Sequence, residues 1–433
     1  MNFLLQIFSE FFVDIGSFLS LTGKVWYFVV PFAFPLVKYL WREYIKRVYR
    51  AKVQYVLLEI VPPKEVEKSP QPMELFFASL SGTTRGFNAY DLFVEGQVPN
   101  FFSFEVVGNG GEIRFYIHCE KKFRNMVEAN LFAQYPDMEI YEAEDYVRSV
   151  PSTIPNNEWD LWGVELEALK DDLYPIRTYR FFEEDVTGKM VDPMAGMLES
   201  LAKLPPGQQI WFQLVVWAPK PGDYQRMFKS TIDAFLGKKK ETKGVFSSGF
   251  LADLADVFGN VFRGMFGTPE FSNPNAKLKE NEQPVEFRLR PVEKDVLKAL
   301  ETNYGKIQLL VKPRIVHVGR KESFDKNLSS KAFLGALSAF TDQNMNGFKK
   351  GKRSETKADF FMVEERATQR KRRLFNRYID RDDDPDDTSV YMSAEELATM
   401  FHPPDMSVMT PTLVRVSAKR GGAPANLPVF IEE

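Results

Sequence analysis

The hydrophobic pattern separates an apolar N-terminal segment from a longer body of short periodic runs. Between Val25 and Trp41 the only charge, Lys38, interrupts an otherwise apolar and aromatic stretch. As a helix this stretch rises about 25 Å, close to the ~30 Å hydrocarbon core of a bilayer. The pattern predicts a transmembrane helix over residues 23–45; the alternative is a helix buried in a protein core.

Aromatic and basic residues flank this predicted span, as they do at membrane interfaces, and spans tolerate proline as a kink. The residues assigned to the anchor are Trp26, Tyr27, Pro31, Pro35, Lys38, Tyr39, Trp41 and Arg42. Basic residues concentrate after the span. The positive-inside rule therefore predicts a single-pass protein of the cytoplasmic membrane, with the bulk of the chain in the cytoplasm.

Residues 1–22 carry apolar side chains at three- and four-residue steps, which predicts an amphipathic helix lying at the membrane surface. Its two acids, Glu10 and Asp14, and the lack of a basic start argue against a cleaved signal peptide. The alternative is a second span that forms a hairpin with the first.

The body begins with short strands and helices over residues 53–148. The pattern predicts strands near 54–62, 101–107, 112–119 and 138–141 and helices near 73–80 and 122–134. The order β-α-β-β-α-β is that of a ferredoxin-like unit. The string GNGG at 108–111 joins two strands, so it predicts a hairpin turn and not a phosphate-binding loop.

Residues 157–345 predict a second α/β sandwich unit that an insertion at 222–284 interrupts. Its strands are expected near 159–167, 209–217 and 306–318, and its helices near 193–202 and 293–303. Residues 346–433 form a C-terminal extension with a charged helix and an acidic linker. The predicted fold class is α+β, with an N-terminal membrane helix followed by two ferredoxin-like units and this extension.

An aromatic helical face lies inside the insertion, at residues 245–266. A helix with such a face must bury it, which makes it a candidate docking helix. Packing within its own domain, docking to a partner protein and binding to lipid are the three open interpretations. The residues on this face are Phe250, Leu254, Phe258, Phe262 and Phe266.

The net charge of −3 comes from 56 Lys and Arg against 59 Asp and Glu, so any polyanionic partner must meet a local patch. Basic residues crowd within 349–381, just before the acidic string at 382–387. This patch suits nucleic-acid phosphates, with Arg370, Lys371, Arg372, Arg373 and Arg377 as its candidate residues. The alternative is a solvated charged segment whose adjacent acids neutralise the basic helix.

Catalytic and metal-binding patterns are missing from the sequence. Its only cysteine, Cys119, excludes a disulfide or a Cys-based zinc site within one chain. No complete Walker A, HExxH or G-x-S-x-G string occurs. We therefore expect no enzyme activity and no cofactor, a packing or capping role for His402, and solvated positions for the acids Glu142, Glu144, Asp145, Asp171 and Asp172.

Several long strings carry a resemblance to a known family. They are KSPQPMELFFASLSG at 68–82, FFSFEVVGNGGEIRFYIHC at 101–119, RNMVEANLFAQYPDMEIYEAEDY at 124–146, DPMAGMLESLAKLPPGQQIWFQLVV at 192–216, and the string from Ser393 to Pro428. Together they resemble the N-terminal region of membrane-anchored type IV secretion or conjugation-like ATPases of candidate-phylum (Patescibacteria) bacteria. The similarity extends over nearly the whole chain after the predicted membrane helix.

In longer members of that family the segment equivalent to 426–428 leads into a P-loop ATPase domain, which this sequence lacks. No catalytic residue is therefore carried over. The resemblance implies a non-enzymatic, membrane-tethered scaffold that docks a separately encoded secretion or DNA-translocation ATPase. The alternatives are a nucleic-acid-binding accessory protein of DNA transfer that uses 349–381, and a lipid-binding protein that uses 245–266.

Overall fold

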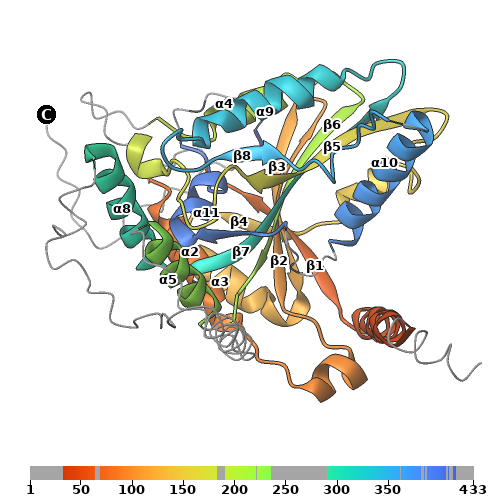
Figure 1. Cartoon of the computed structure of the whole chain (residues 1–433). Coiled ribbons are helices and arrows are strands. Elements are labelled where there is room, and N and C mark those ends of the chain that lie inside the picture. The colour runs from red at the N-terminus through yellow and green to blue at the C-terminus, as the bar shows by residue number, and fades with distance from the viewer. Residues whose placement is uncertain are drawn as a thin grey trace, which may run out of the picture.

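The chain folds as an α+β protein around one large antiparallel sheet (Figure 1). The computed structural model describes residues 33–63, 69–182, 191–220, 222–235, 290–360, 362–381, 385, 388–405, 408 and 413–415. Within these residues nine strands form the sheet, with the path β4-β1-β3-β2-β6-β7-β5-β8 and with β9 paired to β7.

The first half of the sheet comes from residues before 150. Its elements are β1 (Tyr55–Val61), α2 (Gln71–Ser79), β2 (Phe101–Asn109), β3 (Glu112–Glu120), α3 (Arg124–Gln134) and β4 (Glu139–Glu142). A two-residue turn joins β2 to β3, where Gly110 (φ 56°) and Gly111 (φ 94°) adopt the left-handed backbone that favours glycine. The predicted hairpin turn is confirmed.

The second half follows the same element order at its start. Its elements are β5 (Trp159–Ala168), α4 (Ala195–Ala202), β6 (Gln208–Trp217), α5 (Asp223–Phe235), α8 (Pro291–Tyr304), β7 (Gln308–Arg320), α9 (Leu334–Leu337) and β8 (Phe348–Lys350). The chain then adds α10 (Val363–Asp380), β9 (Val390–Ser393) and α11 (Ala394–Met400).

The two halves join where β2 pairs with β6, from Phe101 opposite Trp217 to Asn109 opposite Gln209. Each half contributes four neighbouring strands, β4-β1-β3-β2 and β6-β7-β5-β8, and this pairing joins them edge to edge. Each junction strand would be an exposed edge in an isolated unit, whereas β6 is buried along its whole length. The two halves therefore share one sheet.

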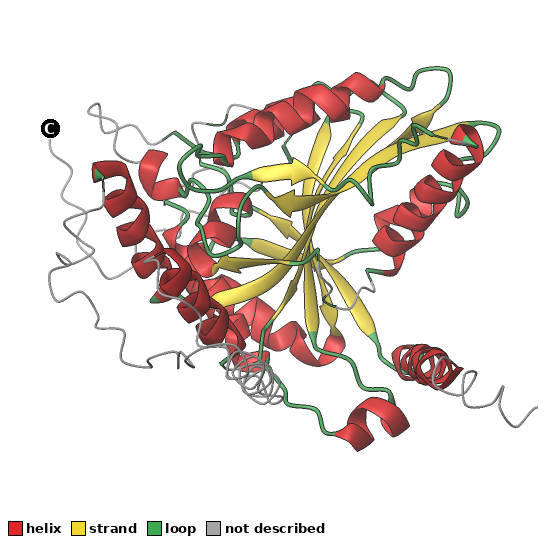
Figure 2. Ribbon diagram, viewed as in Figure 1, coloured by secondary structure: helices red, strands yellow, loops and turns green. Residues whose placement is uncertain are grey.

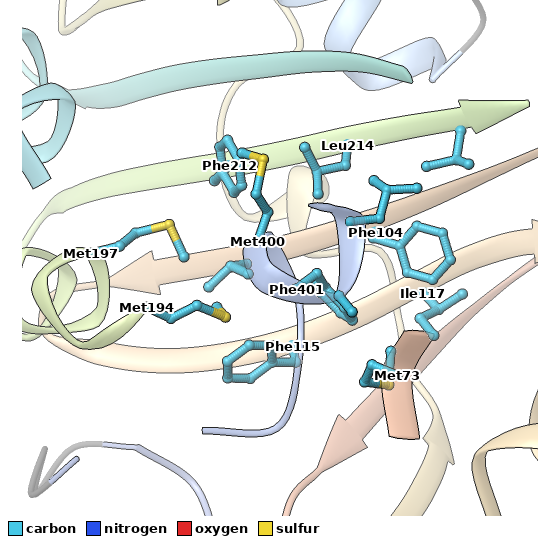
Figure 3. Packing of buried hydrophobic residues seen from close by; sticks show 14 of the residues in the cluster. Met73, Phe104, Phe115, Ile117, Met194, Met197, Phe212, Leu214, Met400 and Phe401 are labelled. Carbon is cyan, nitrogen blue, oxygen red and sulfur yellow. The ribbon is translucent and has the colours of Figure 1, made fainter. Parts of the chain in front are cut away.

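One face of the sheet carries the larger hydrophobic core, beneath α2, α3, α4, α9 and α11. Figure 3 shows Phe401, at the end of α11, among side chains of the sheet and of neighbouring helices. Its ring lies 5.2 Å from that of Phe104 and 5.7 Å from that of Phe115. The C-terminal residues thus complete the core of the first half of the chain.

The opposite face carries a smaller core beneath α10, which lies apart from the other helices beside the sheet (Figure 2). Leu374, Phe375 and Tyr378 of α10 are buried there against strand residues that include Trp211. The basic stretch is therefore an ordered helix that packs on the sheet through these three residues, while most of its charged side chains stay exposed or half-buried.

The predicted membrane anchor is not supported. No helix in the described part of the chain is long and apolar enough to cross a membrane. Residues 33–50 form one helix that runs from the apolar stretch into a basic one, and it includes Pro35, Lys38, Tyr39, Trp41 and Arg42. The expected membrane helix, single-pass topology and cytoplasmic-membrane location are therefore wrong. Residues 1–22 and Trp26, Tyr27 and Pro31 lie outside the described residues.

Two of the side chains assigned to a membrane interface contact the protein itself. Trp41 Nε1 donates a hydrogen bond to the carbonyl of Phe93 at 2.8 Å. Lys38 Nζ lies 4.9 Å from the centre of the Phe93 ring, within the range of a cation–π contact. These contacts explain aromatic and basic residues at this position without a bilayer.

Candidate polyanion-binding groove

A row of polar side chains crosses the sheet on the face that α10 covers. Glu105 of β2, Gln213 of β6, Arg314 of β7 and Glu165 of β5 lie directly opposite one another on successive strands. All four are buried. Because a buried charge is costly unless it is paired, such a row must be hydrogen-bonded throughout.

The hydrogen bonds run along the whole row. Gln213 Nε2 donates to Glu105 Oε1 at 2.9 Å, and Arg314 Nη1 donates to Gln213 Oε1 at 3.2 Å. Arg314 Nε donates to Glu165 Oε1, also at 3.2 Å. The row therefore links both halves of the sheet through side chains as well as through the β2–β6 backbone.

Arg381 attaches the end of α10 to this row. Its guanidinium donates to both carboxylate oxygens of Glu105, at 2.7 and 3.0 Å, and to both oxygens of Asp145, at 2.6 and 3.0 Å. Burial alone raises the pKa of each acid, but Arg381 holds both pKa values below their ordinary range. Asp145, expected at the solvated surface, is instead a structural ion-pair partner.

Other cations of α10 are also tied to the protein. Arg377 Nη1 lies 3.3 Å from Glu165 Oε1, and Lys371 Nζ donates to Asp160 Oδ1 at 2.6 Å. Arg370 donates to the backbone carbonyls of residues 355 and 357. Three residues of the predicted nucleic-acid patch therefore hold α10 in place.

A hollow of about 410 Å³ lies between α10 and the segment after β8. Its lining residues are Glu165, Arg353, Ser354, Arg370, Arg373, Leu374, Arg377 and Thr388. We call it the arginine groove, after Arg353, Arg370, Arg373 and Arg377. Its one acid, Glu165, is already paired with Arg314 and Arg377.

Two of these arginines lack a protein partner. Among the described residues, neither Arg353 nor Arg373 has a hydrogen-bond or ion-pair partner, and both are exposed. The groove therefore has surplus positive charge on planar guanidinium groups. Such groups match the geometry of carboxylate or phosphate oxygens.

The backbone next to the groove is held close to the sheet. Gly351 N donates to the carbonyl of Glu165 at 2.9 Å, and the Ser354 hydroxyl accepts from the Glu165 amide at 3.1 Å. A Cβ on Gly351 would lie 2.8 Å from that Glu165 carbonyl, so only glycine fits. On the α10 side, a Cβ on Gly163 would lie 2.6 Å from Leu374 Cδ2.

The structure sorts the predicted site residues into groups. Arg370, Arg373 and Arg377 line the groove, Lys371 pairs with an acid, and Arg372 is exposed without lining the groove. Sequence reasoning did not single out Arg353 or the acid Glu165. Three acids lie within β5, at 160, 165 and 167, and only the structure shows that Glu165 is the buried one. The candidate docking helix, with Phe250, Leu254, Phe258, Phe262 and Phe266, lies outside the described residues.

A second cavity, of about 490 Å³, lies between residues 175–181, α8 and the start of α11. Its buried carboxylate, Glu395, forms ion pairs with Arg180 at 2.9 Å and with Lys306. The charge at this position is therefore matched within the protein. No group of three or more metal-ligating side chains occurs among the residues that the structure describes.

The histidines take structural positions. His402 Nδ1 lies 2.8 Å from the carbonyl of Ala398, and its Nε2 lies 3.2 Å from Asp192 Oδ1, which agrees with the expected packing role. Burial lowers the pKa of His317 to about 4 and that of His118 to about 3. These two rings are therefore neutral near pH 7.

Comparison with known proteins gives a family but no activity. No curated protein matches the chain. A family model described as a domain of unknown function (DUF8128) matches residues 39–415. Because this match covers most of the sequence, the chain belongs to the DUF8128 family.

Proposed function

We propose that this protein is a non-catalytic binding protein that holds the phosphate backbone of a nucleic acid in the arginine groove. The observation that carries the proposal is the pair Arg353 and Arg373, which line the groove without a partner among the described residues. Phosphate oxygens are strong acceptors for guanidinium groups, and such contacts supply most of the affinity of non-specific nucleic-acid binding.

The arrangement of α10 favours a polymer over a single anion. Arg366, Arg370, Arg373 and Arg377 follow one another at steps of four, three and four residues, so they share one face of the helix. The row extends about 16 Å along the helix axis. A polymer with a phosphate on every nucleotide meets several of these charges at once, whereas a free phosphate meets one or two.

The two acids that pair with α10 near the groove do not bind Arg353 or Arg373. Among the described residues, Glu165 is shared by two arginines, and Asp160 is paired with Lys371. Docking of a separately encoded ATPase and lipid binding by 245–266 remain predictions, because no described feature bears on either one.

Binding of a labelled oligonucleotide, followed by fluorescence anisotropy over a salt series, tests the proposal. The double variant Arg353→Ala/Arg373→Ala should weaken binding at least tenfold and make it less salt-dependent, because each lost phosphate contact lowers the slope by about one. The control Lys203→Ala/Lys229→Ala removes the same charge from two exposed positions, one directly after α4 and one on α5. Equal losses in the two double variants, or no binding at low salt, would contradict the proposal.

A further inference from the structure

Large apolar side chains are exposed just before and at the start of α10, ahead of its first groove-lining residue, Arg370. Phe360 is 81% exposed, Met362 54% and Val363 45%. Three large apolar side chains so exposed within four positions differ from the scattered apolar residues of an ordinary surface. They are a candidate contact for a partner that has flat apolar faces as well as negative charge.

Backbone contacts fix this aromatic residue relative to the groove. Arg366 donates to the carbonyl of Phe360, and Arg370 donates to the carbonyl of Lys357. The segment before α10 therefore runs antiparallel to the helix, which places Phe360 at the level of Arg366. The level of Arg373 lies seven residues further along, or about 10 Å along the helix axis.

We infer that the partner is single-stranded nucleic acid, with phosphates at Arg353 and Arg373 and a base stacked on Phe360. This inference rests on the proposed function and specifies its ligand. A duplex stacks its bases inside, whereas an unpaired base presents a free face to an aromatic ring. Proteins that bind single strands combine a basic groove with aromatic stacking positions.

The distance between Phe360 and Arg373 favours single-stranded nucleic acid over other anions. Adjacent phosphates along one nucleic-acid chain are several ångströms apart. The distance of about 10 Å between the levels of Phe360 and Arg373 therefore corresponds to a few nucleotides. An acidic peptide also carries negative charge, but it lacks a flat face repeated at every unit. Nucleic acid alone supplies both groups at regular intervals.

The test measures the affinity of the full chain for three probes: an unstructured oligo-dT, a duplex of equal length and inorganic polyphosphate. Phe360→Ala should lower the affinity for oligo-dT by roughly five- to a hundredfold, the usual effect of losing one stacked base. It should leave polyphosphate binding unchanged within twofold, because polyphosphate has no base. Phe360→Trp, which keeps a stacking surface, should retain oligo-dT binding.

The outcomes separate this inference from the proposed function. In one outcome Phe360→Ala changes neither the affinity for oligo-dT nor that for polyphosphate, and in another it weakens both equally. Either result would contradict base stacking on Phe360 and leave the proposed phosphate binding in place. Tighter binding of the duplex, or stronger competition by poly-glutamate than by oligo-dT, would also overturn the inference. If Arg353→Ala/Arg373→Ala leaves all three probes unaffected, the proposed function itself fails. Because Phe360 is exposed, its variants should melt at the wild-type temperature, which shows that any loss of binding is local.

Discussion

Glu105 and Gln213 lie directly opposite each other at the centre of the β2–β6 junction, and Gln213 Nε2 donates to Glu105 Oε1 at 2.9 Å. A slip of one residue would bring Phe212 or Leu214 opposite Glu105. Both face the larger core on the other side of the sheet, so a slip would leave the carboxylate unmatched. The pair thus fixes the register with which the two halves join.

Arg381→Ala should destabilise the protein by about 3–5 kcal/mol, because it leaves Glu105 and Asp145 without their shared cation in a buried site. Urea unfolding measures this loss. Arg372→Ala on the same helix is the control, and it should change the free energy of unfolding by less than about 0.5 kcal/mol, because Arg372 is exposed. A loss below about 1 kcal/mol for Arg381→Ala would show that Glu105 is satisfied by other groups.

The same site predicts an acid-sensitive stability. The pKa values of Glu105 and Asp145 are lowered in the fold, so their contribution is fully present above the unfolded pKa. It is lost as the pH falls through the lower folded values, when the carboxylates take up protons. Unfolding free energies measured from pH 7 down to acid should show this decline. Glu105→Gln, which removes one titrating group, should flatten the curve.

Asp172 predicts the opposite dependence. Burial raises its pKa to about 6, so the folded state binds more protons than the unfolded state between the ordinary carboxyl pKa and pH 6. The charged form opposes folding, and stability falls as the pH rises through this window. Asp172→Asn keeps an acceptor for the Tyr391 amide and should stabilise the protein by about 1–3 kcal/mol at pH 7. The gain should vanish below pH 4; a gain that persists there would contradict this origin.

Much of the sheet was predictable because its strands are local patterns. The predicted strands near 101–107, 112–119, 159–167 and 209–217 match β2, β3, β5 and β6 to within two residues. Alternating and fully buried apolar runs carry that signal. The pairing of β2 with β6 was not predictable. The two strands lie about a hundred residues apart, and the sequence of an edge strand does not indicate which other strand it pairs with.

The candidate site was also only partly predictable from the sequence. The crowding of arginines in α10 is visible in the sequence, but which of them are structural depends on distant acids. Glu165 lies 212 positions from Arg377, and Glu105 lies 276 positions from Arg381. That Arg353 and Arg373 have no partner among the described residues emerges only after these pairings are known. The missed helix α11 is short, and the aromatic residue that follows it packs against strands from the other end of the chain.

Gly163→Ala should disturb both the fold and the groove. The added Cβ would lie 2.6 Å from Leu374 Cδ2 and 2.7 Å from the Ile315 carbonyl, so α10 must shift outward. We expect a loss of about 1–3 kcal/mol in unfolding free energy and weaker oligonucleotide binding. The control is Gly82→Ala, whose Cβ would meet nothing within 4 Å. Wild-type stability and binding in Gly163→Ala would show that α10 tolerates displacement.

Replacing the five aspartates at 382, 383, 384, 386 and 387 with asparagine should tighten oligonucleotide binding about three- to tenfold at low salt. In the sequence Asp387 directly precedes Thr388, which lines the arginine groove. Exposed charges repel one another noticeably only within about a Debye length, roughly 10 Å at 0.1 M salt. Repulsion between these carboxylates and phosphate weakens binding, and salt screens that repulsion. The difference between the asparagine variant and wild type in fluorescence anisotropy should therefore shrink as salt is added. Weaker binding by the asparagine variant would show that the aspartate charges do not compete with the phosphates.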